Sequence, residues 1–210
     1  VNDGCSEATY TQKVTVNYPA SRATVTDANG REYQTVRIGC DCWIAENLKT
    51  SAEGAAYYNE DNANESFGLL YDWNSAVGSN NTVKTCKTGT YIQGVCPDGW
   101  ALPTVAKFNN MLAEVGDIEA LKSDDETTWL PGNAGTNTSG FGAKGAGYYE
   151  AMQYQRQLGY TYFWTCELNP SNSLVARTVE LRCGCGEFTV YDKSKESKVS
   201  VRCVKVELND

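Results

Sequence analysis

Cysteine residues are the clearest candidates for chemistry in this sequence. Nine occur among 210 residues, and two close pairs, "CDC" at 40–42 and "CGC" at 183–185, could together supply four thiolates. Sets of thiolates bind zinc or copper(I) in proteins. Structural zinc sites prefer two or more residues between paired ligands, so disulfide bonds are the favoured interpretation and a metal site is the alternative.

The absence of histidine narrows the chemistry further. The chain contains no His, although imidazole is the usual general base at neutral pH and the commonest metal ligand. Ser-His-Asp and Cys-His catalysis are therefore excluded within this chain. His-ligated zinc sites, and the iron site built from two His and one carboxylate, are excluded for the same reason.

Two segments combine carboxylate, amide and aromatic side chains. In "YYNEDNANESFGLLYDW" (57–73), oxygen-rich residues could hold calcium, and aromatic rings beside amides are typical of sugar-binding surfaces. The alternative is a solvated turn whose Asx side chains cap their own backbone while the aromatic rings join the core. "CELNPSNS" (166–173) adds two further oxygen ligands. The candidate ligand-binding residues are Tyr57, Tyr58, Asp61, Trp73, Glu167 and Asn169.

Charge and hydrophobicity limit the partners of the chain. Its formal net charge is -8 and its sequence pI about 4.7, with no basic run long enough to form a patch, so nucleic acid is not expected to bind. The apolar runs are far shorter than the roughly 20 residues of a transmembrane helix, so we expect membrane contact only through an anchor that the sequence lacks. The many cysteines predict an exported protein whose leader has been removed.

The elements that must position these residues begin with one clear helix. Apolar residues three and four apart predict a helix over 105–115, with Thr104 as its N-cap after Pro103. A shorter helix with Asp117 as its cap is expected next. Residues 129–147 are rich in Gly and Asn and predict a long, structured loop.

Short strands account for most of the remaining domain. Alternating or β-branched segments predict strands at 160–166, 174–183, 187–192 and 199–208. Because strands and helices do not alternate as βαβ units, the sequence predicts an α+β fold.

The N-terminal part of the chain divides in two. Residues 8–18 alternate as a strand that Pro19 ends, so residues 1–22 are interpreted as an arm or the end of a preceding module, and 23–207 as the domain. The domain is expected to begin with two short strands joined by a turn at Asp27–Gly30, where "NG" is a hairpin signal.

Six segments occur in an order that identifies a family resemblance. They are "VTDANGREYQTVRIGCDCWIAENLKT", "YYNEDNANESFGLLYDWNSA", "CPDGWALPTVAKFNNML", "TWLPGNAGTNTSGFGAKGAGYY", "GYTYFWTCE" and "VSVRCVKV". Together they resemble successive blocks of the Fibrobacter succinogenes major paralogous domain family, from about residue 24 to residue 206. The resemblance implies a C-type-lectin-like fold with short antiparallel strands, one or two helices and long loops stapled by disulfides. It also implies an exported or surface-displayed bacterial protein, often a lipoprotein.

The resemblance also implies one disulfide bond, between Cys96 and Cys203. A second bridge is expected between Cys166 and either Cys183 or Cys185, because strands that flank one turn lie near each other. The odd number of cysteines leaves one thiol over, for which Cys5 is the first candidate.

The expected function is that of a non-enzymatic, adhesin-like module on the outer membrane of a Gram-negative bacterium. It would bind glycan or a surface protein through the loops at 57–73 and 131–147. No cofactor is expected, with calcium as the open alternative. A second hypothesis is a structural or tip subunit of a surface fibre, in which residues 8–18 pair with a neighbouring subunit. A third, which rests on the fold-level resemblance to formylglycine-generating enzymes, is a copper-dependent oxidase.

Overall fold

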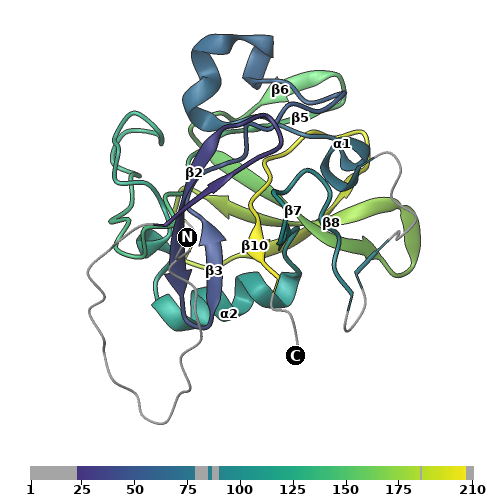
Figure 1. Ribbon diagram of the computed structural model, residues 1–210. Helices are drawn as coiled ribbons and strands as arrows, with labels where there is room; N and C mark the ends of the chain where they lie inside the picture. The colour runs from purple at the N-terminus through teal and green to yellow at the C-terminus, as the bar shows by residue number, and fades with distance from the viewer. Residues whose placement is uncertain (1–22, 79–84, 87–89, 185, 207–210) are drawn as a thin grey trace.

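Antiparallel strands form three sheets, and one longer helix packs on the outside of them. The computed structural model describes residues 23–78, 85–86, 90–184 and 186–206 (Figure 1). The predicted arm, with residues 8–18 and Cys5, lies outside the described residues, as does Cys185. Every strand pair in the three sheets is antiparallel. The expected α+β class is therefore confirmed.

The strands are distributed unevenly among the sheets. Five form the order β1-β2-β3-β10-β4, with bounds Thr24–Thr26, Glu32–Ile38, Asp41–Ile44, Val204–Lys205 and Trp100–Ala101. The second sheet is the hairpin of β5 (Tyr148–Glu150) and β6 (Gln153–Gln155). The third has the order β7-β8-β9, with bounds Tyr160–Asn169, Asn172–Arg182 and Thr189–Ser194.

The helices of the described residues are short except for one. They are α1 (Trp73–Val77), α2 (Val105–Val115) and the 3-10 helices η1 (Tyr58–Glu60), η2 (Asn62–Phe67) and η3 (Ile118–Ala120). As predicted, the Thr104 hydroxyl accepts a hydrogen bond from the backbone N–H of Lys107 at 3.1 Å. Gly116 ends α2 with φ +73°, a conformation that favours glycine. Asp117 caps the next helix as expected, although that helix is a single 3-10 turn.

The predicted N-terminal turn is confirmed. One carboxylate oxygen of Asp27 accepts hydrogen bonds from the backbone N–H groups of Asn29 and Arg31, both at 2.9 Å. Gly30 has φ +80°, which completes the turn between β1 and β2.

The predicted last strand is mostly wrong. Of its described part, residues 199–206, only Val204–Lys205 forms a ladder. Val199 and Ser200 instead make single bridges to Tyr71 and Phe163, because this segment passes from one sheet to another. The alternation in the sequence reflects burial on both sides, since Val199, Ser200 and their successors up to 203 are all buried.

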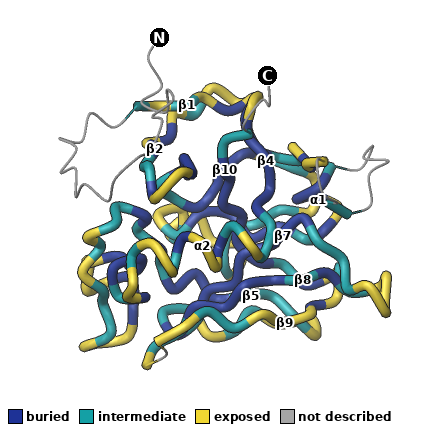
Figure 2. The backbone as a smooth tube through the Cα atoms, turned by 90° about the horizontal axis from the view of Figure 1, so that it is seen from below, coloured by how far each residue is buried: buried dark blue, intermediate teal, exposed yellow. Residues whose placement is uncertain are grey.

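The core consists of two clusters, one on each side of this crossing segment. The first surrounds Trp73 and Trp164, whose rings meet edge-to-face at 5.4 Å. The second packs α2 against β7, with Phe108 stacked on Phe163 at 5.8 Å. Figure 2 shows buried positions gathered along the inner strands and exposed positions at the periphery.

Arg202 lies between the two clusters and is fully buried. Its guanidinium donates to the Asn47 side chain and to the backbone carbonyl groups of Ile44, Phe141 and Gly142, at distances of 2.7 to 3.1 Å. Burial lowers the pKa of Arg202 to about 9. These bonds fasten the predicted loop at 129–147, which contains no helix or strand, to the crossing segment.

The predicted bridge between Cys96 and Cys203 is confirmed. The second prediction is wrong, since Cys166 bonds to Cys86. The register explains the error: the backbone N–H of Cys183 donates to the carbonyl of Gly159, seven residues away from Cys166 along β7. Disulfide bonds persist in oxidising compartments, so they indicate an exported protein.

Two cysteines of the described residues are free, Cys40 on the surface and Cys183 in a partly buried position. Cys42 is disulfide-bonded. Its sulfur is therefore unavailable to the four-thiolate site that the two close cysteine pairs suggested.

Candidate ligand-binding face

The two residues predicted as calcium ligands in 166–173 are used inside the protein. One carboxylate oxygen of Glu167 accepts the backbone N–H of Val105 at 2.9 Å, at the start of α2, and the other lies 3.2 Å from Arg177. The Asn169 amide oxygen accepts the backbone N–H groups of Ser171 and Asn172, which closes the β7–β8 turn. Among the described residues, no group of three or more Cys, Asp or Glu side chains could hold a metal.

Most candidates in 57–73 follow the alternative interpretation, that of a turn over a core. Trp73 is only 3% exposed and packs on Trp164, so its prediction as a ligand contact is wrong. Asp61 accepts the backbone N–H of Ala63 at 2.9 Å and caps η2. Tyr57 is partly buried and packs against the first core cluster.

Tyr58 has a different environment, because it meets the β5–β6 hairpin. Tyr149 and Tyr154 are direct partners across this hairpin, with ring centroids 4.9 Å apart. The Tyr58 ring packs on Tyr154 at 5.3 Å. Figure 1 shows the turn that contains η1 and η2 beside β5 and β6.

The opposite side of the hairpin carries a second group of rings. Tyr148 alternates with Tyr149 and packs edge-to-face on Tyr162 of β7 at 5.1 Å. Tyr162 is stacked on Tyr160 at 6.4 Å and contacts Tyr191 of β9 at 6.2 Å. We call this second group the tyrosine face, which comprises Tyr148, Tyr160, Tyr162 and Tyr191.

A buried lysine joins the hairpin to the three-stranded sheet. The Lys193 ammonium lies 4.2 Å from the centroids of both the Tyr148 and Tyr162 rings and 3.3 Å from a carboxylate oxygen of Glu150. The other oxygen of Glu150 accepts the Ser197 hydroxyl at 3.1 Å. Cation–π contacts in a desolvated position are worth up to about 2 kcal/mol. Lys193 therefore fixes the relative position of the rings.

The buried carboxylate of Glu180 is only half satisfied. One oxygen accepts the hydroxyl of Tyr162, and the other has no hydrogen-bond partner, with Arg182 Nε at 3.5 Å as the cation that the structure pairs with it. Burial, followed by the contact with Glu180, raises the pKa of the Tyr162 hydroxyl far above its usual value. A half-satisfied carboxylate that is 3% exposed costs free energy, which is common at functional sites.

Backbone strain concentrates in the segments around the same hairpin. Among the described non-glycine residues, seven have positive φ, and six of them lie in the two segments that contribute Tyr58 and the β5–β6 hairpin. Such conformations cost of the order of 1 kcal/mol or more each and cluster at ligand-binding sites. The six residues are Asn59, Glu60, Ala151, Met152, Arg156 and Leu158.

Another concave region of the described surface has a different character. A cavity of about 410 Å³ lies between the β1–β2 turn and residues 93–98. One of the two carboxylates that line it, that of Asp27, already accepts hydrogen bonds from the hydroxyls of Tyr33 and Thr50. These bonds and those of the backbone lower the pKa of Asp27 despite its burial. The Asp27 carboxylate of this cavity is therefore already used within the protein.

The sequence contained a signal for the tyrosine face that residue-type patterns alone did not single out. Five of the chain's 13 tyrosines fall in residues 148–162, and Tyr191 follows later. The segment was predicted only in part, as a strand from residue 160. Its tyrosine density was the available signal.

A comparison with protein-family models identifies the family of the chain. The family model described as the Fibrobacter succinogenes major domain matches residues 36–205, which is more than half of the chain. Neither the curated proteins nor the solved structures contain a significant match. The part of the chain that the structure describes has no helix with the length and apolar character needed to cross a bilayer. On the family match, the chain belongs to the Fibrobacter succinogenes major domain family.

Proposed function

We propose that this protein is a non-enzymatic, adhesin-like module of the cell surface that binds glycan through the tyrosine face. The observation that carries the proposal is the exposed Tyr191 ring, 43% accessible, backed by the packed rings of Tyr162 and Tyr160. Aromatic rings present large apolar faces with a polar edge, which suits the mixed surface of a sugar. Rings that are already held in place lose little conformational entropy on binding.

The proposed fold and location fit this role. In a C-type-lectin-like arrangement, a helix packs against a curled antiparallel sheet, and the Cys96–Cys203 bridge joins the segment before α2 to the segment before β10. The disulfide bonds favour an oxidising environment outside the cytoplasm. An outer-membrane location in a Gram-negative bacterium is part of the proposal.

A non-enzymatic role is favoured by the state of the cysteines. A copper-dependent oxidase of the formylglycine-generating type uses paired thiols. The two free cysteines among the described residues come from separate sheets: Cys40 follows β2, and Cys183 follows β8. The other described cysteines are disulfide-bonded.

A second candidate function is a subunit of a surface fibre. Among the described strands, β9 pairs only with β8, and its exposed residues include Val190 and Tyr191. An unpaired strand edge can accept a strand from a neighbouring subunit. The predicted donor, residues 8–18, lies outside the described residues.

A glycan array tests the leading proposal. The wild-type protein should bind specific glycans equally with calcium and with chelator, because Glu167 and Asn169 already bond within the protein. Tyr191→Ala should weaken binding about tenfold, as loss of an aromatic hot-spot residue does. The matched control is Tyr91→Ala, since Tyr91 is 55% exposed on the segment before β4.

Three results would contradict the proposal or its site. An array that stays blank in both conditions favours the fibre candidate, for which deletion of residues 1–20 should abolish assembly. Equal losses in Tyr191→Ala and Tyr91→Ala would move the site away from the tyrosine face. Binding that needs calcium would return attention to carboxylates such as Asp61.

A further inference from the structure

One end of the tyrosine face carries two arginines. The Arg156 guanidinium carbon lies 5.8 Å from the centroid of the Tyr160 ring, in a cation–π contact. Tyr160 and Arg182 are direct partners across β7 and β8, so their side chains emerge on the same side of the sheet. The Arg156 guanidinium therefore lies beside the Tyr160 ring, and the Arg182 side chain leaves the sheet on the same side as that ring.

The two arginines remain accessible although one has an acidic neighbour. The Arg182 side chain is 40% exposed, whereas its ion-pair partner Glu180 is 3% exposed and cannot cover it. Arg156 is an exposed residue and makes no ion pair with any carboxylate of the described part of the chain. Its backbone has φ +60°, a strained conformation that a functional requirement would explain.

The charge at this end is opposite to that of the whole protein. The chain has a formal net charge of -8, which repels anions in general. Two accessible arginine side chains that share Tyr160 as a neighbour are a local exception, and such groups favour an anionic ligand group. Guanidinium is suited above all to a carboxylate or a phosphate, which it can bind through two parallel hydrogen bonds.

The arginines lie close enough to the exposed ring to act on the same ligand. The Tyr162 ring separates the two ends of the face, with its centroid 6.4 Å from Tyr160 and 6.2 Å from Tyr191. A short oligosaccharide stacked on Tyr191 spans that length. One sugar can therefore stack while a neighbouring sugar meets the arginines.

We propose that Arg156 and Arg182 form a subsite for the carboxylate of an acidic sugar, so that the ligand of the tyrosine face is a uronate-containing glycan. Tyr160 acts as a positioning residue, because its ring holds the Arg156 guanidinium. The buried Glu180 carboxylate positions the Arg182 side chain through their ion pair. The inference rests on the proposed function, since the stacking on Tyr191 supplies the neutral part of the recognition.

The test compares each acidic oligosaccharide with its own neutral form. The probes are oligomers of galacturonate, glucuronate and mannuronate, each paired with the same oligomer after carboxyl reduction, and binding is measured by calorimetry. The wild-type protein should bind at least one uronate oligomer about tenfold more tightly than its reduced partner. Arg156→Gln should remove most of that difference, and Arg156→Lys should restore part of it.

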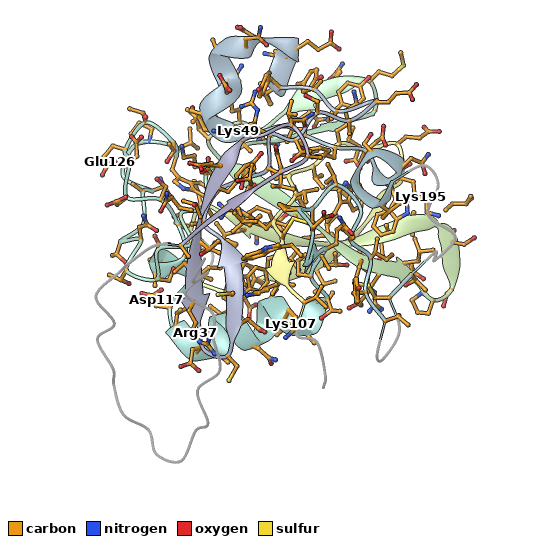
Figure 3. The ribbon with its side chains drawn as sticks, viewed as in Figure 1. Arg37, Lys49, Lys107, Asp117, Glu126 and Lys195 are labelled. Atoms are coloured by element: carbon orange, nitrogen blue, oxygen red, sulfur yellow. A yellow bond between two sulfur atoms is a disulfide. The ribbon has the colours of Figure 1, made fainter. Side chains whose placement is uncertain are left out.

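Arg37→Gln is the matched control, because it removes the same charge elsewhere. Figure 3 shows Arg37 beside α2, at the opposite end of the molecule from β5 and β6. This variant should bind the uronate oligomer as the wild type does. Thermal unfolding of all three variants checks that none has lost its fold.

The outcomes separate this inference from the proposed function. If reduced and unreduced oligomers bind equally, or if only neutral glycans bind, the uronate subsite is wrong and glycan binding stands. If no glycan binds in either form, both proposals fail. If polyglutamate binds as tightly as the uronate oligomers, the arginines recognise an acidic peptide, and the glycan inference is overturned.

Discussion

Two glutamate–arginine pairs on the same pair of strands differ in how completely their carboxylates are used. Glu167 lies 3.2 Å from Arg177, and its other oxygen accepts the N–H of Val105. Glu180 lies 3.5 Å from Arg182, and one of its oxygens has no hydrogen-bond donor. The first carboxylate is 21% exposed and the second 3%, so the more buried group is the less satisfied one.

This difference in hydrogen bonding suggests different roles for the two pairs. The Glu167–Arg177 pair is structural, and the Glu180–Arg182 pair is the functional candidate. The Glu167 pair closes the start of α2, where a negative charge is favoured by the helix dipole. The Glu180 pair retains an unmet hydrogen bond, and burial makes that cost larger. Because this cost lies beside exposed rings and strained backbone, we take the Glu180 pair as the functional candidate of the two.

The largest expected effect comes from the disulfide next to Glu167. Replacement of Cys86 and Cys166 by Ala removes a bridge between residues 80 apart in sequence, which the chain-entropy model values at about 4 kcal/mol. The free energy of unfolding, measured with urea, should fall by about that amount. Glycan binding should survive wherever the variant is folded, because the tyrosine face lies at the other end of β7.

Cys40→Ala is the control for this prediction, since Cys40 is free and exposed. A loss of stability of similar size in that variant would show that the assay responds to thiol chemistry. A loss of binding in the folded double variant would contradict the separation of the two regions.

The next effect concerns the hydroxyl that satisfies Glu180. Tyr162→Phe leaves this buried carboxylate without a hydrogen-bond donor among the described residues, and a hydrogen bond to a charged group contributes about 2 kcal/mol. The free energy of unfolding should fall by about that amount. Tyr191→Phe is the matched control and should change it little. A change below about 0.5 kcal/mol in Tyr162→Phe would mean that the Glu180 side chain relaxes to find another partner.

Because of the same hydroxyl, we expect the free energy of unfolding to decrease at alkaline pH. Burial and Glu180 raise the pKa of Tyr162 in the folded state above its unfolded value near 10. The contribution of the neutral Tyr162 hydroxyl to the free energy of unfolding is therefore fully present below pH 10. It is lost as the pH rises above 10. Burial also raises the pKa of Tyr33 to about 12, so part of this loss persists in Tyr162→Phe. Urea unfolding between pH 9 and 11 should show a decline about 1 kcal/mol per pH unit shallower in the variant.

Local features of the fold were predictable from the sequence. The cap at Thr104, the apolar spacing that follows it and the turn at Asp27–Gly30 each depend on neighbouring residues, and all three predictions are confirmed. The pairing of Cys166 depended on the register of β7 and β8, which no local pattern fixes.

The candidate site was harder to predict for a physical reason. Trp73 and Tyr191 are both aromatic residues beside polar ones in the sequence, yet the first is buried and the second exposed. The residue types at 166–173 predict Glu167 as a ligand, although its carboxylate bonds to the start of α2. No local pattern singles out Glu180. Whether a carboxylate is satisfied depends on contacts between distant segments, which residue types alone do not reveal.

The smallest expected effect compares the two arginines directly. Arg177→Gln removes an ion pair that is partly exposed at both ends, and such pairs contribute about 0.5 kcal/mol. It should lower the free energy of unfolding by that small amount and leave glycan binding unchanged. Arg182→Gln takes the paired cation away from the buried Glu180, so it should lower the free energy of unfolding by more than Arg177→Gln does. It should also weaken the binding of a uronate oligomer severalfold.

The pair of variants is informative because each is the control for the other. Both remove one positive charge from β8, so a general electrostatic effect on an acidic ligand would weaken binding in both. Such a long-range effect would also disappear in high salt, since exposed charges are screened beyond about 10 Å at 0.1 M. A loss confined to Arg182→Gln that persists in salt requires direct contact between Arg182 and the ligand. Equal losses would mean that the two glutamate–arginine pairs differ in hydrogen bonding and not in function.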